Sequence, residues 1–196
     1  MLAKSASKLY MDPRTLQEHL EAFNHIVLQH QELVYNQAYR LLGEADAAED
    51  AAQEAFILAY RKFDSYRNGS LKAWLLRIVT NYCYDELRRW KRHPLTALEP
   101  INAEGEEIES PSWLIDPNEE PEQEMERAEL GQDIQHCLNA LPFGQRSVVI
   151  LVDLQGLEYQ EAARVMGISV GTVKSRLARA RTRLRGMLLE AGITPA

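Results

Sequence analysis

Apolar residues recur every three or four positions along most of this chain, the spacing that gathers side chains on one face of an α-helix. The first such stretch extends from Thr15 to Leu42 and predicts one or two amphipathic helices that end at Gly43. The second begins with Asp46-Ala-Ala-Glu49, which has the form of a capping box with Asp46 as the N-cap, and runs to about Phe63. A third extends from Leu71 to about Lys91. No segment has the pattern of a strand, so the sequence predicts an all-α protein.

The C-terminal part of the chain contains a second kind of pattern. A short helical segment, Tyr159 to Met166, stops at Gly167, a residue type that readily adopts the left-handed backbone conformation at a helix end. Ser169 is the expected N-cap of a longer helix that begins at Val170. Helix, glycine-containing turn and second helix are typical of the helix-turn-helix, in which the second helix enters the DNA major groove.

This second helix has two different faces. Its apolar positions form one stripe, made by Val173, Leu177, Ala180, Leu184 and Met187. Between Lys174 and Arg185 there are six basic residues and no acidic one. Like charges at this density repel one another unless a polyanion neutralises them. A solvated basic surface is the alternative interpretation, but the helix-turn-helix pattern favours DNA binding.

Composition changes in the middle of the chain. Residues 94–124 contain five of the eight prolines and almost no apolar periodicity, which predicts a linker without a core of its own. Residues 93–130 contain twelve acidic residues and one basic residue, whereas residues 1–92 carry a net charge of +1 and residues 131–196 a net charge of +3. The total charge of −7 therefore does not exclude nucleic-acid binding by the flanking parts.

These patterns divide the 196 residues into two small helical domains. We expect an N-terminal domain of residues 1–92, an acidic, flexible, Pro-rich linker of residues 93–126 and a C-terminal helix-turn-helix domain of residues 127–196. Further helices are expected from Pro121 to Leu141 and from Arg146 to Leu154, before the helix-turn-helix.

Several function classes find no support in the residues. The chain has no run of eighteen apolar residues and no apolar core of a secretory signal near its N-terminus, so we predict no membrane insertion and a cytoplasmic protein. Cys83 and Cys137 are isolated and the histidines are scattered, so neither a disulfide nor a metal site is expected. No nucleophile–base pair or phosphate-binding glycine loop is present, so we expect no catalytic residues, no cofactor and no small-molecule substrate.

Two groups of residues, one in each domain, form a joint pattern. The C-terminal group consists of Leu141, Pro142, Arg146, Gly156, Tyr159, Glu161, Ala162, Ala163, Gly167, Ser169 and residues 171–176. The N-terminal group consists of Glu49, Asp50, Gln53, Glu54, Phe56, Phe63, Trp74, Asn81, Asp85, Arg88 and Arg89. The first group resembles region 4 and the second resembles region 2 of the group 4, extracytoplasmic-function (ECF), sigma factors of bacterial RNA polymerase, in the sigma-70 family.

The resemblance implies that the C-terminal domain reads the upstream (−35) promoter element. The corresponding candidates are Ser169, Gly171, Thr172, Lys174, Ser175, Arg176 and Arg179. Arginine can pair bidentately with guanine, and lysine can neutralise a phosphate. Arg181, Arg183 and Arg185 lie further along the helix, where phosphates or solvent are the expected neighbours.

For the N-terminal domain the resemblance implies recognition of the −10 element. Unpaired bases require a stacking surface with amide or hydroxyl partners, and backbone phosphates require cations. The candidates are Phe63, Tyr66, Arg67, Asn68, Arg77, Asn81, Arg88 and Arg89. Trp74 is instead expected to anchor its helix in the core.

The resemblance further implies that Asp50, Gln53 and Glu54 bind the core polymerase, although an exposed polar helix face is the simpler interpretation of the residues alone. The expected partners are core RNA polymerase, promoter DNA and an anti-sigma factor. The implied function is that of a transcription initiation factor, not an enzyme. Two alternatives remain, a stand-alone helix-turn-helix regulator and a sigma mimic that titrates an anti-sigma factor.

Overall fold

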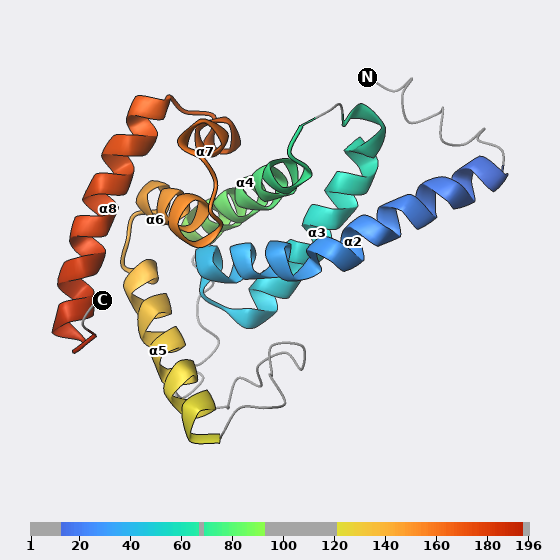
Figure 1. Ribbon diagram of the computed structural model, residues 1–196. Helices are drawn as coiled ribbons and strands as arrows, with labels where there is room; N and C mark the ends of the chain where they lie inside the picture. The colour runs from blue at the N-terminus through green and yellow to red at the C-terminus, as the bar shows by residue number, and fades with distance from the viewer. Residues whose placement is uncertain (1–12, 67–68, 93–120, 194–196) are drawn as a thin grey trace.

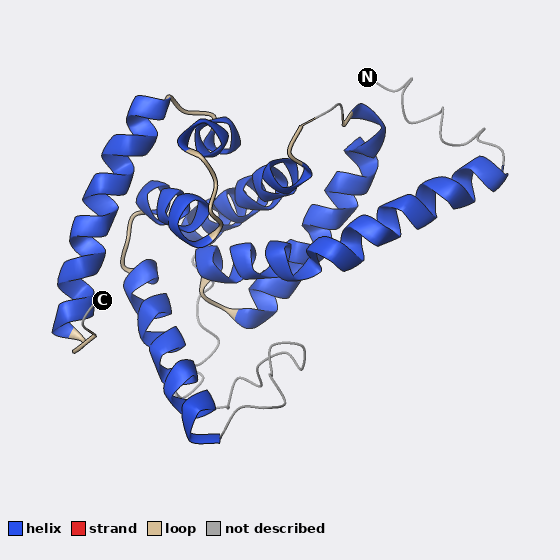
Figure 2. Cartoon of the chain, viewed as in Figure 1, coloured by secondary structure: helices blue, strands red, loops and turns tan. Residues whose placement is uncertain are grey.

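The structure is a computed structural model that describes residues 13–66, 69–92 and 121–193. Throughout these ranges the chain consists of helices joined by short loops, with no strand (Figure 2). This confirms the predicted all-α class. Residues 93–120 of the predicted linker, together with Arg67 and Asn68, lie outside the described residues.

The N-terminal domain is built on a single long helix, α2 (Pro13–Leu42), where the sequence left one or two helices open. It packs along α3 (Ala45–Lys62) and α4 (Leu71–Arg92), and a turn of 3-10 helix, η2 (Phe63–Ser65), follows α3 (Figure 1). The buried face of α3 consists of small residues, which allow the backbones of the neighbouring helices to approach that of α3 closely. These residues are Ala48, Ala51, Ala52, Ala55 and Ala59.

The predicted start of α3 was wrong by two residues. The helix begins at Ala45 with Glu44 as its N-cap, and no side chain caps it. Asp46 lies inside the first turn, where a negative charge interacts favourably with the positive end of the helix dipole without forming a cap. The capping-box pattern in the sequence is therefore not accompanied by a side-chain cap at the start of α3.

Helices α2 and α4 share the core of this domain. Leu41, Leu75, Leu76 and Val79 are fully or almost fully buried between them. A polar contact crosses the same core, because the buried Gln37 Nε2 donates a hydrogen bond to Thr80 Oγ1 at 3.1 Å. The contact satisfies two groups that would otherwise be costly to bury.

The C-terminal domain, as far as residue 193, contains four α-helices: α5 (Pro121–Asn139), α6 (Phe143–Val149), α7 (Tyr159–Met166) and α8 (Val170–Glu190). Helix α5 begins inside the range that we assigned to the linker. The helix expected from Arg146 to Leu154 is present as α6 and a π-helical turn, η3 (Ile150–Leu154). Helix α8 lies along the outer side of α6 and α7 (Figure 1).

The two domains are in contact. Helix α7 packs against α4, and α5 and α6 pack against the C-terminal end of α2 (Figure 1). The buried apolar residues of both domains form one connected cluster. The contact between the domains could not be predicted from the sequence pattern, because the periodicity within one helix does not indicate which other helix packs against it.

Candidate nucleic-acid interface

The helix-turn-helix is formed by α7, a tight turn and α8. Gly167 ends α7 in the left-handed conformation, with φ of 63°, which a side chain would strain. Ser169 caps α8, and its Oγ accepts a hydrogen bond from the Thr172 N–H at 3.1 Å. The bounds of α7, the role of Gly167, the Ser169 cap and the start of α8 at Val170 are confirmed.

The apolar stripe of α8 fixes which of its faces is presented to solvent. Val173, Leu177 and Ala180 are buried against α6 and α7. Leu184 and Met187 are partly buried and continue the same stripe. The opposite, basic face is therefore exposed, as a helix that inserts into a groove requires.

Lys174, Ser175 and Arg179 are the exposed side chains at the centre of this face. Ser175 and Arg179 lie on successive turns because residues four apart share one side of a helix, and Lys174 is the neighbour of Ser175 on the same turn. The Lys174 ammonium lies 5.9 Å from the centre of the Tyr159 ring, at the start of α7. Ser175 Oγ donates to the Thr172 carbonyl at 3.1 Å, so its hydroxyl hydrogen is already used within the helix while its oxygen can still accept a hydrogen bond. We call these three residues the α8 outer face.

Arg176 lies in a different environment from Arg179. Its side chain is half-buried and turns back toward the start of α6. A Cβ placed on Gly144 would stand only 2.8 Å from Arg176 Nη1, so the guanidinium lies directly over the Gly144 backbone and would have to shift if a side chain were added there. In the sequence, Arg176 and Arg179 are both basic residues of the same helix and cannot be told apart. In the structure they have different environments. Helix periodicity does not indicate that Gly144 lies close to Arg176.

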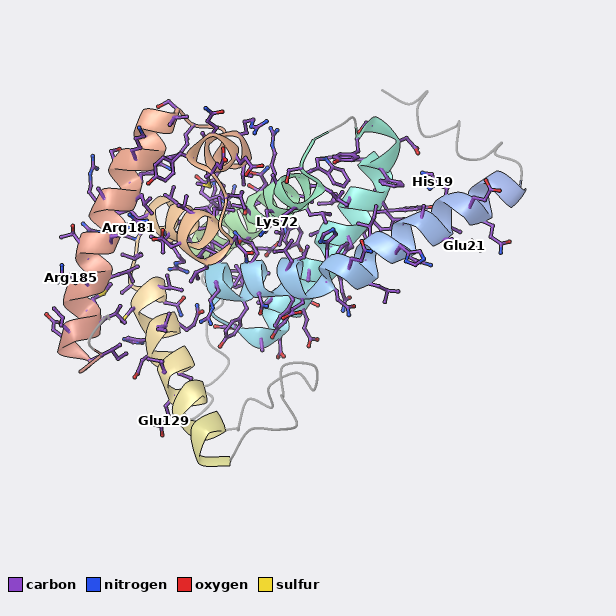
Figure 3. All side chains as sticks on the ribbon, in the orientation of Figure 1. His19, Glu21, Lys72, Glu129, Arg181 and Arg185 are labelled. Carbon is purple, nitrogen blue, oxygen red and sulfur yellow. The ribbon has the colours of Figure 1, made fainter. Side chains whose placement is uncertain are left out.

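Arg181 is paired across the helix-turn-helix with Asp153 of η3. Its Nε and Nη2 donate to the two carboxylate oxygens at 3.0 and 2.5 Å, a bidentate geometry. This hydrogen bonding raises the pKa of Arg181 above its usual value. Arg183 and Arg185 are exposed, and Figure 3 shows Arg181 and Arg185 along the same helix. Sequence analysis missed Asp153 because it lies 28 residues from its partner.

Three of the candidates for the −10 element share one face of α4. Arg77, Asn81 and Arg88 are all exposed and separated by whole numbers of helical turns to a close approximation. The Arg88 guanidinium lies 5.6 Å from the centre of the Tyr84 ring. Arg89, which is exposed as well, forms an ion pair with Glu86.

The aromatic candidates are engaged in contacts within the protein. The Tyr66 ring packs on Trp74 with ring centres 5.0 Å apart, and its hydroxyl donates to the Gly69 carbonyl at 2.6 Å. Trp74 is partly buried and packs against the hydrophobic core, in keeping with the expected anchoring role, and its remaining surface contacts Tyr66. The Phe63 ring packs against Phe23 at 5.4 Å, which assigns it chiefly to the core of this domain.

The outer side of α3 carries the candidate polymerase contacts. Asp50, Gln53 and Glu54 are exposed, on the side opposite the buried alanines. Gln53 also lines a hollow of about 380 Å³ between α2 and α3, whose other lining residues are Val27, Gln31, Tyr35, Glu49, Ala52 and Phe56. The hollow is thus lined by both polar and apolar side chains, a composition suited to a protein partner.

Metal-binding groups do not assemble anywhere in the described part of the chain, where no cluster of three or more His, Cys, Asp or Glu side chains occurs. None of the helices in the described ranges is long and apolar enough to cross a membrane.

Both domains match known protein families. Residues 131–184 match sigma-70, region 4, and residues 26–93 match sigma-70 region 2. The chain is 39% identical over 169 residues to the ECF RNA polymerase sigma factor SigE of Mycolicibacterium smegmatis; the match covers 86% of this chain and 62% of that protein, so the chain spans less than two thirds of its length. It is 37% identical to the ECF RNA polymerase sigma factor SigW of Bacillus subtilis, over 86% of this chain and 89% of that protein.

Among solved structures, the chain is similar to the sigma factor RpoE in complex with the anti-sigma factor NepR from Bartonella quintana. The TM-score is 0.64 at 29% identity, and the match covers 86% of this chain and 98% of that one. The similarity therefore extends over both domains. With both regions present in order and a relative matched over most of both chains, this protein belongs to the ECF sigma factors of the sigma-70 family.

Proposed function

We propose that this protein is a dissociable promoter-specificity subunit of a bacterial RNA polymerase. The observation that carries the proposal is the α8 outer face, Lys174, Ser175 and Arg179, exposed on a capped helix-turn-helix in a chain of this family. The chemistry of RNA synthesis belongs to the polymerase, and the protein acts in the cytoplasm beside it. Its own contribution is to choose where transcription starts.

We assign the −35 element to the start of α8. Arg179 and Lys174 supply the base-edge and phosphate contacts, and Ser169, Gly171, Thr172 and Ser175 allow the backbone to approach closely. The remaining candidate, Arg176, contributes through its contact with α6, because its guanidinium lies beside Gly144.

The −10 element is assigned to α4 and the turn before it. Arg77, Arg88 and Arg89 are exposed cations suited to the phosphate backbone, and Asn81 offers an exposed amide to a base. The Tyr66–Trp74 pair supplies the stacking surface for the bases. Arg67 and Asn68 follow Tyr66 directly in the sequence.

The exposed face of α3 with Asp50, Gln53 and Glu54 is assigned to the core polymerase. A further partner is an anti-sigma factor, since the chain is similar over both domains to a sigma factor solved with one. The alternative of a stand-alone DNA-binding regulator lacks a role for the exposed polar face of α3.

Run-off transcription with bacterial core polymerase, on DNA from upstream of this gene, tests the proposal. Transcripts with a defined start are expected only when the protein is present. Arg179→Ala and Asn81→Ala are expected to lower the yield at least tenfold, whereas Lys62→Ala, at an exposed position on α3, serves as the control. Absence of both transcript and core binding would support the stand-alone regulator, and core binding without transcription at any promoter would support the mimic.

A further inference from the structure

A histidine near the beginning of α2 contacts the segment that leads into the turn before α4. His19 Nε2 lies 2.7 Å from Oδ1 of Asp64, a residue of η2 that follows it by 45 positions in the chain. The His19 side chain is 16% exposed and the Asp64 side chain is 55% exposed, so the ring is enclosed and the carboxylate lies at the surface. Figure 3 shows His19 on the side of α2 that faces α3.

Aromatic rings hold the imidazole in this position. Its centre lies 5.1 Å from that of the Phe63 ring and 5.7 Å from that of the Tyr60 ring, both edge to face. Phe23, one turn further along α2, packs on Tyr60 at 5.1 Å and on Phe63 at 5.4 Å. Edge-to-face contacts are a favourable geometry for aromatic pairs. The three aromatic neighbours therefore fix the direction in which His19 presents its nitrogens.

The two nitrogens of His19 have different surroundings. Nε2 faces a carboxylate oxygen of Asp64, and an ionised carboxylate accepts hydrogen bonds but donates none. Nδ1 is buried and has no hydrogen-bond partner among the described residues. The arrangement is satisfied when the neutral ring carries its hydrogen on Nε2 and donates it to Asp64. His19 therefore acts as a hydrogen-bond donor directed at η2.

Asp64 is the middle residue of η2, so a restraint on it acts on the residue that follows this turn. The Tyr66 N–H donates to the Phe63 carbonyl at 3.0 Å and closes the turn. The Tyr66 ring then packs on Trp74 of α4, with ring centres 5.0 Å apart. The position of the Tyr66 ring thus depends on η2 on one side and on α4 on the other.

η2 itself has little to hold it in place. It consists of three residues, Phe63–Ser65, and none of them is buried. A single turn of 3-10 helix has poorer hydrogen-bond geometry than an α-helix, and short exposed segments are among those that open most easily. A side chain that holds such a segment in its binding conformation reduces the ordering that binding must supply. The contact from α2 provides such a hold.

We propose that His19 is a positioning residue for recognition of the −10 element. It holds Asp64, and through η2 it presents the Tyr66–Trp74 pair in the geometry that stacks an unpaired base. His19 acts through Asp64 and does not touch DNA, because aromatic rings enclose it. We call the contact of His19 with Asp64 and its aromatic neighbours the His19 brace. Its role in promoter recognition rests on the proposed function, whereas the brace itself does not.

Three substitutions separate the hydrogen bond from the packing. His19→Phe keeps a ring among the aromatic neighbours and removes the donor. His19→Gln retains an N–H donor in place of Nε2–H and is expected to rescue the wild-type behaviour. His25→Gln is the matched control, because His25 is an exposed histidine of the same helix. Circular dichroism checks that all three chains remain folded.

Amide hydrogen exchange and NMR of the full chain test the brace. In His19→Phe the Tyr66 N–H is expected to exchange about fivefold faster than in the wild type, the change that corresponds to one lost hydrogen bond. His19→Gln and the control are expected to keep wild-type exchange. In nitrogen-correlated NMR spectra of the wild type at pH 8, the His19 hydrogen is expected on Nε2. Equal exchange in the wild type and His19→Phe, or a hydrogen on Nδ1, overturns the brace.

Open-complex formation, on the promoter that run-off transcription identifies, tests the role in recognition. His19→Phe is expected to lower the yield about fivefold, with wild-type affinity for core polymerase, and His19→Gln is expected to restore it. General damage to the domain would weaken core binding as well, because α3 continues directly into η2.

The possible failures are distinguishable. Wild-type yield from His19→Phe, in spite of faster Tyr66 exchange, would overturn the positioning role and leave the proposed function standing. Absence of any transcript with the wild type would refute the proposed function and the positioning role that rests on it, and the exchange measurement would still decide the brace.

Discussion

At the scale of single residues, the cations of α8 are not equivalent. Arg179 is exposed and has no partner among the described residues, Lys174 is exposed above a Tyr159 ring, and Arg181 is held by Asp153. A free arginine on a groove-facing helix is suited to a bidentate base contact, whereas a cation already paired with a carboxylate contributes little to DNA affinity. The partners of each cation therefore decide its function.

The first prediction concerns Arg179. Arg179→Ala is expected to weaken binding to a −35 duplex by about 1–3 kcal/mol and to relax the preference at one base pair, because a bidentate base contact is lost. Fluorescence anisotropy with a set of single-base-pair variants measures both effects. Lys174→Ala, by contrast, is expected to weaken binding evenly across the set. An even loss from Arg179→Ala would assign that residue to phosphate instead.

A second prediction concerns Asp153. Asp153→Asn removes the charge that holds Arg181, so Arg181 becomes available to a phosphate. Non-specific DNA affinity is expected to rise, and the slope of log K against log salt is expected to steepen by about 0.9. The double variant Asp153→Asn/Arg181→Gln should return to the wild-type slope. An unchanged slope in the single variant would mean that Arg181 does not reach DNA.

At the scale of elements, the helix-turn-helix depends on the groups that end α7 and begin α8. The Glu161 carboxylate accepts the Glu158 N–H at 3.4 Å, which supports the start of α7 although Glu158 is not a favoured cap residue. Gly167 then reverses the chain, and Ser169 satisfies a free N–H at the start of α8. These local features set where α7 and α8 begin and end, and the packing of the apolar stripe of α8 on α6 and α7 then orients the DNA-facing helix.

The Ser169 cap provides the third prediction. Ser169→Ala leaves the Thr172 N–H without its side-chain acceptor and is expected to lower the free energy of unfolding by about 1 kcal/mol. Urea denaturation followed by circular dichroism measures the change. Ser175→Ala is a matched control, because Ser175 Oγ bonds a carbonyl within the helix and caps no end. Equal effects of the two substitutions would contradict the capping role.

At the scale of the whole molecule, each domain contains one buried cysteine. Cys83 is fully buried in α4, and Cys137 in α5 is 4% exposed. Burial raises the pKa of Cys83 to about 12 and raises the pKa of Cys137 as well. Because only the thiolate reacts readily, both thiols are protected for as long as the domain around them stays folded.

The fourth prediction uses this protection. At pH 8 in native buffer neither thiol is expected to react with a disulfide reagent, whereas the urea-unfolded chain should release two equivalents of the chromophore. Stability contributed by the neutral Cys83 thiol is expected to be lost as the pH rises from 9 toward 12, since the unfolded chain ionises first. Comparison of unfolding free energies of the wild type and Cys83→Ala across pH 8–10 tests the sign. Rapid labelling of the native chain would contradict the buried position.

Much of the fold followed from local patterns. Helical periodicity predicted α4 to within about a residue, and Gly167, Ser169 and Val170 marked the turn and the start of α8 correctly, because caps and left-handed glycines act over a few neighbouring residues. Asp46 was misassigned because a motif of small and acidic residues also fits the first turn of a helix. The site residues were proposed from the resemblance to a known family. Helix periodicity alone does not determine which of them are exposed to solvent.

By itself, the sequence determined the helical class, the helix-turn-helix and its basic face, since each depends on the order of residues along a few turns. Only the tertiary structure decided that Arg176 turns toward Gly144, that Asp153 holds Arg181 and that Arg146 joins the ends of α2 and α5. The contact of Arg181 with Asp153 links residues 28 positions apart, and that of Arg146 with Leu41 links residues 105 positions apart. Their formation depends on the packing of one helix against another, which brings together groups that no local pattern relates.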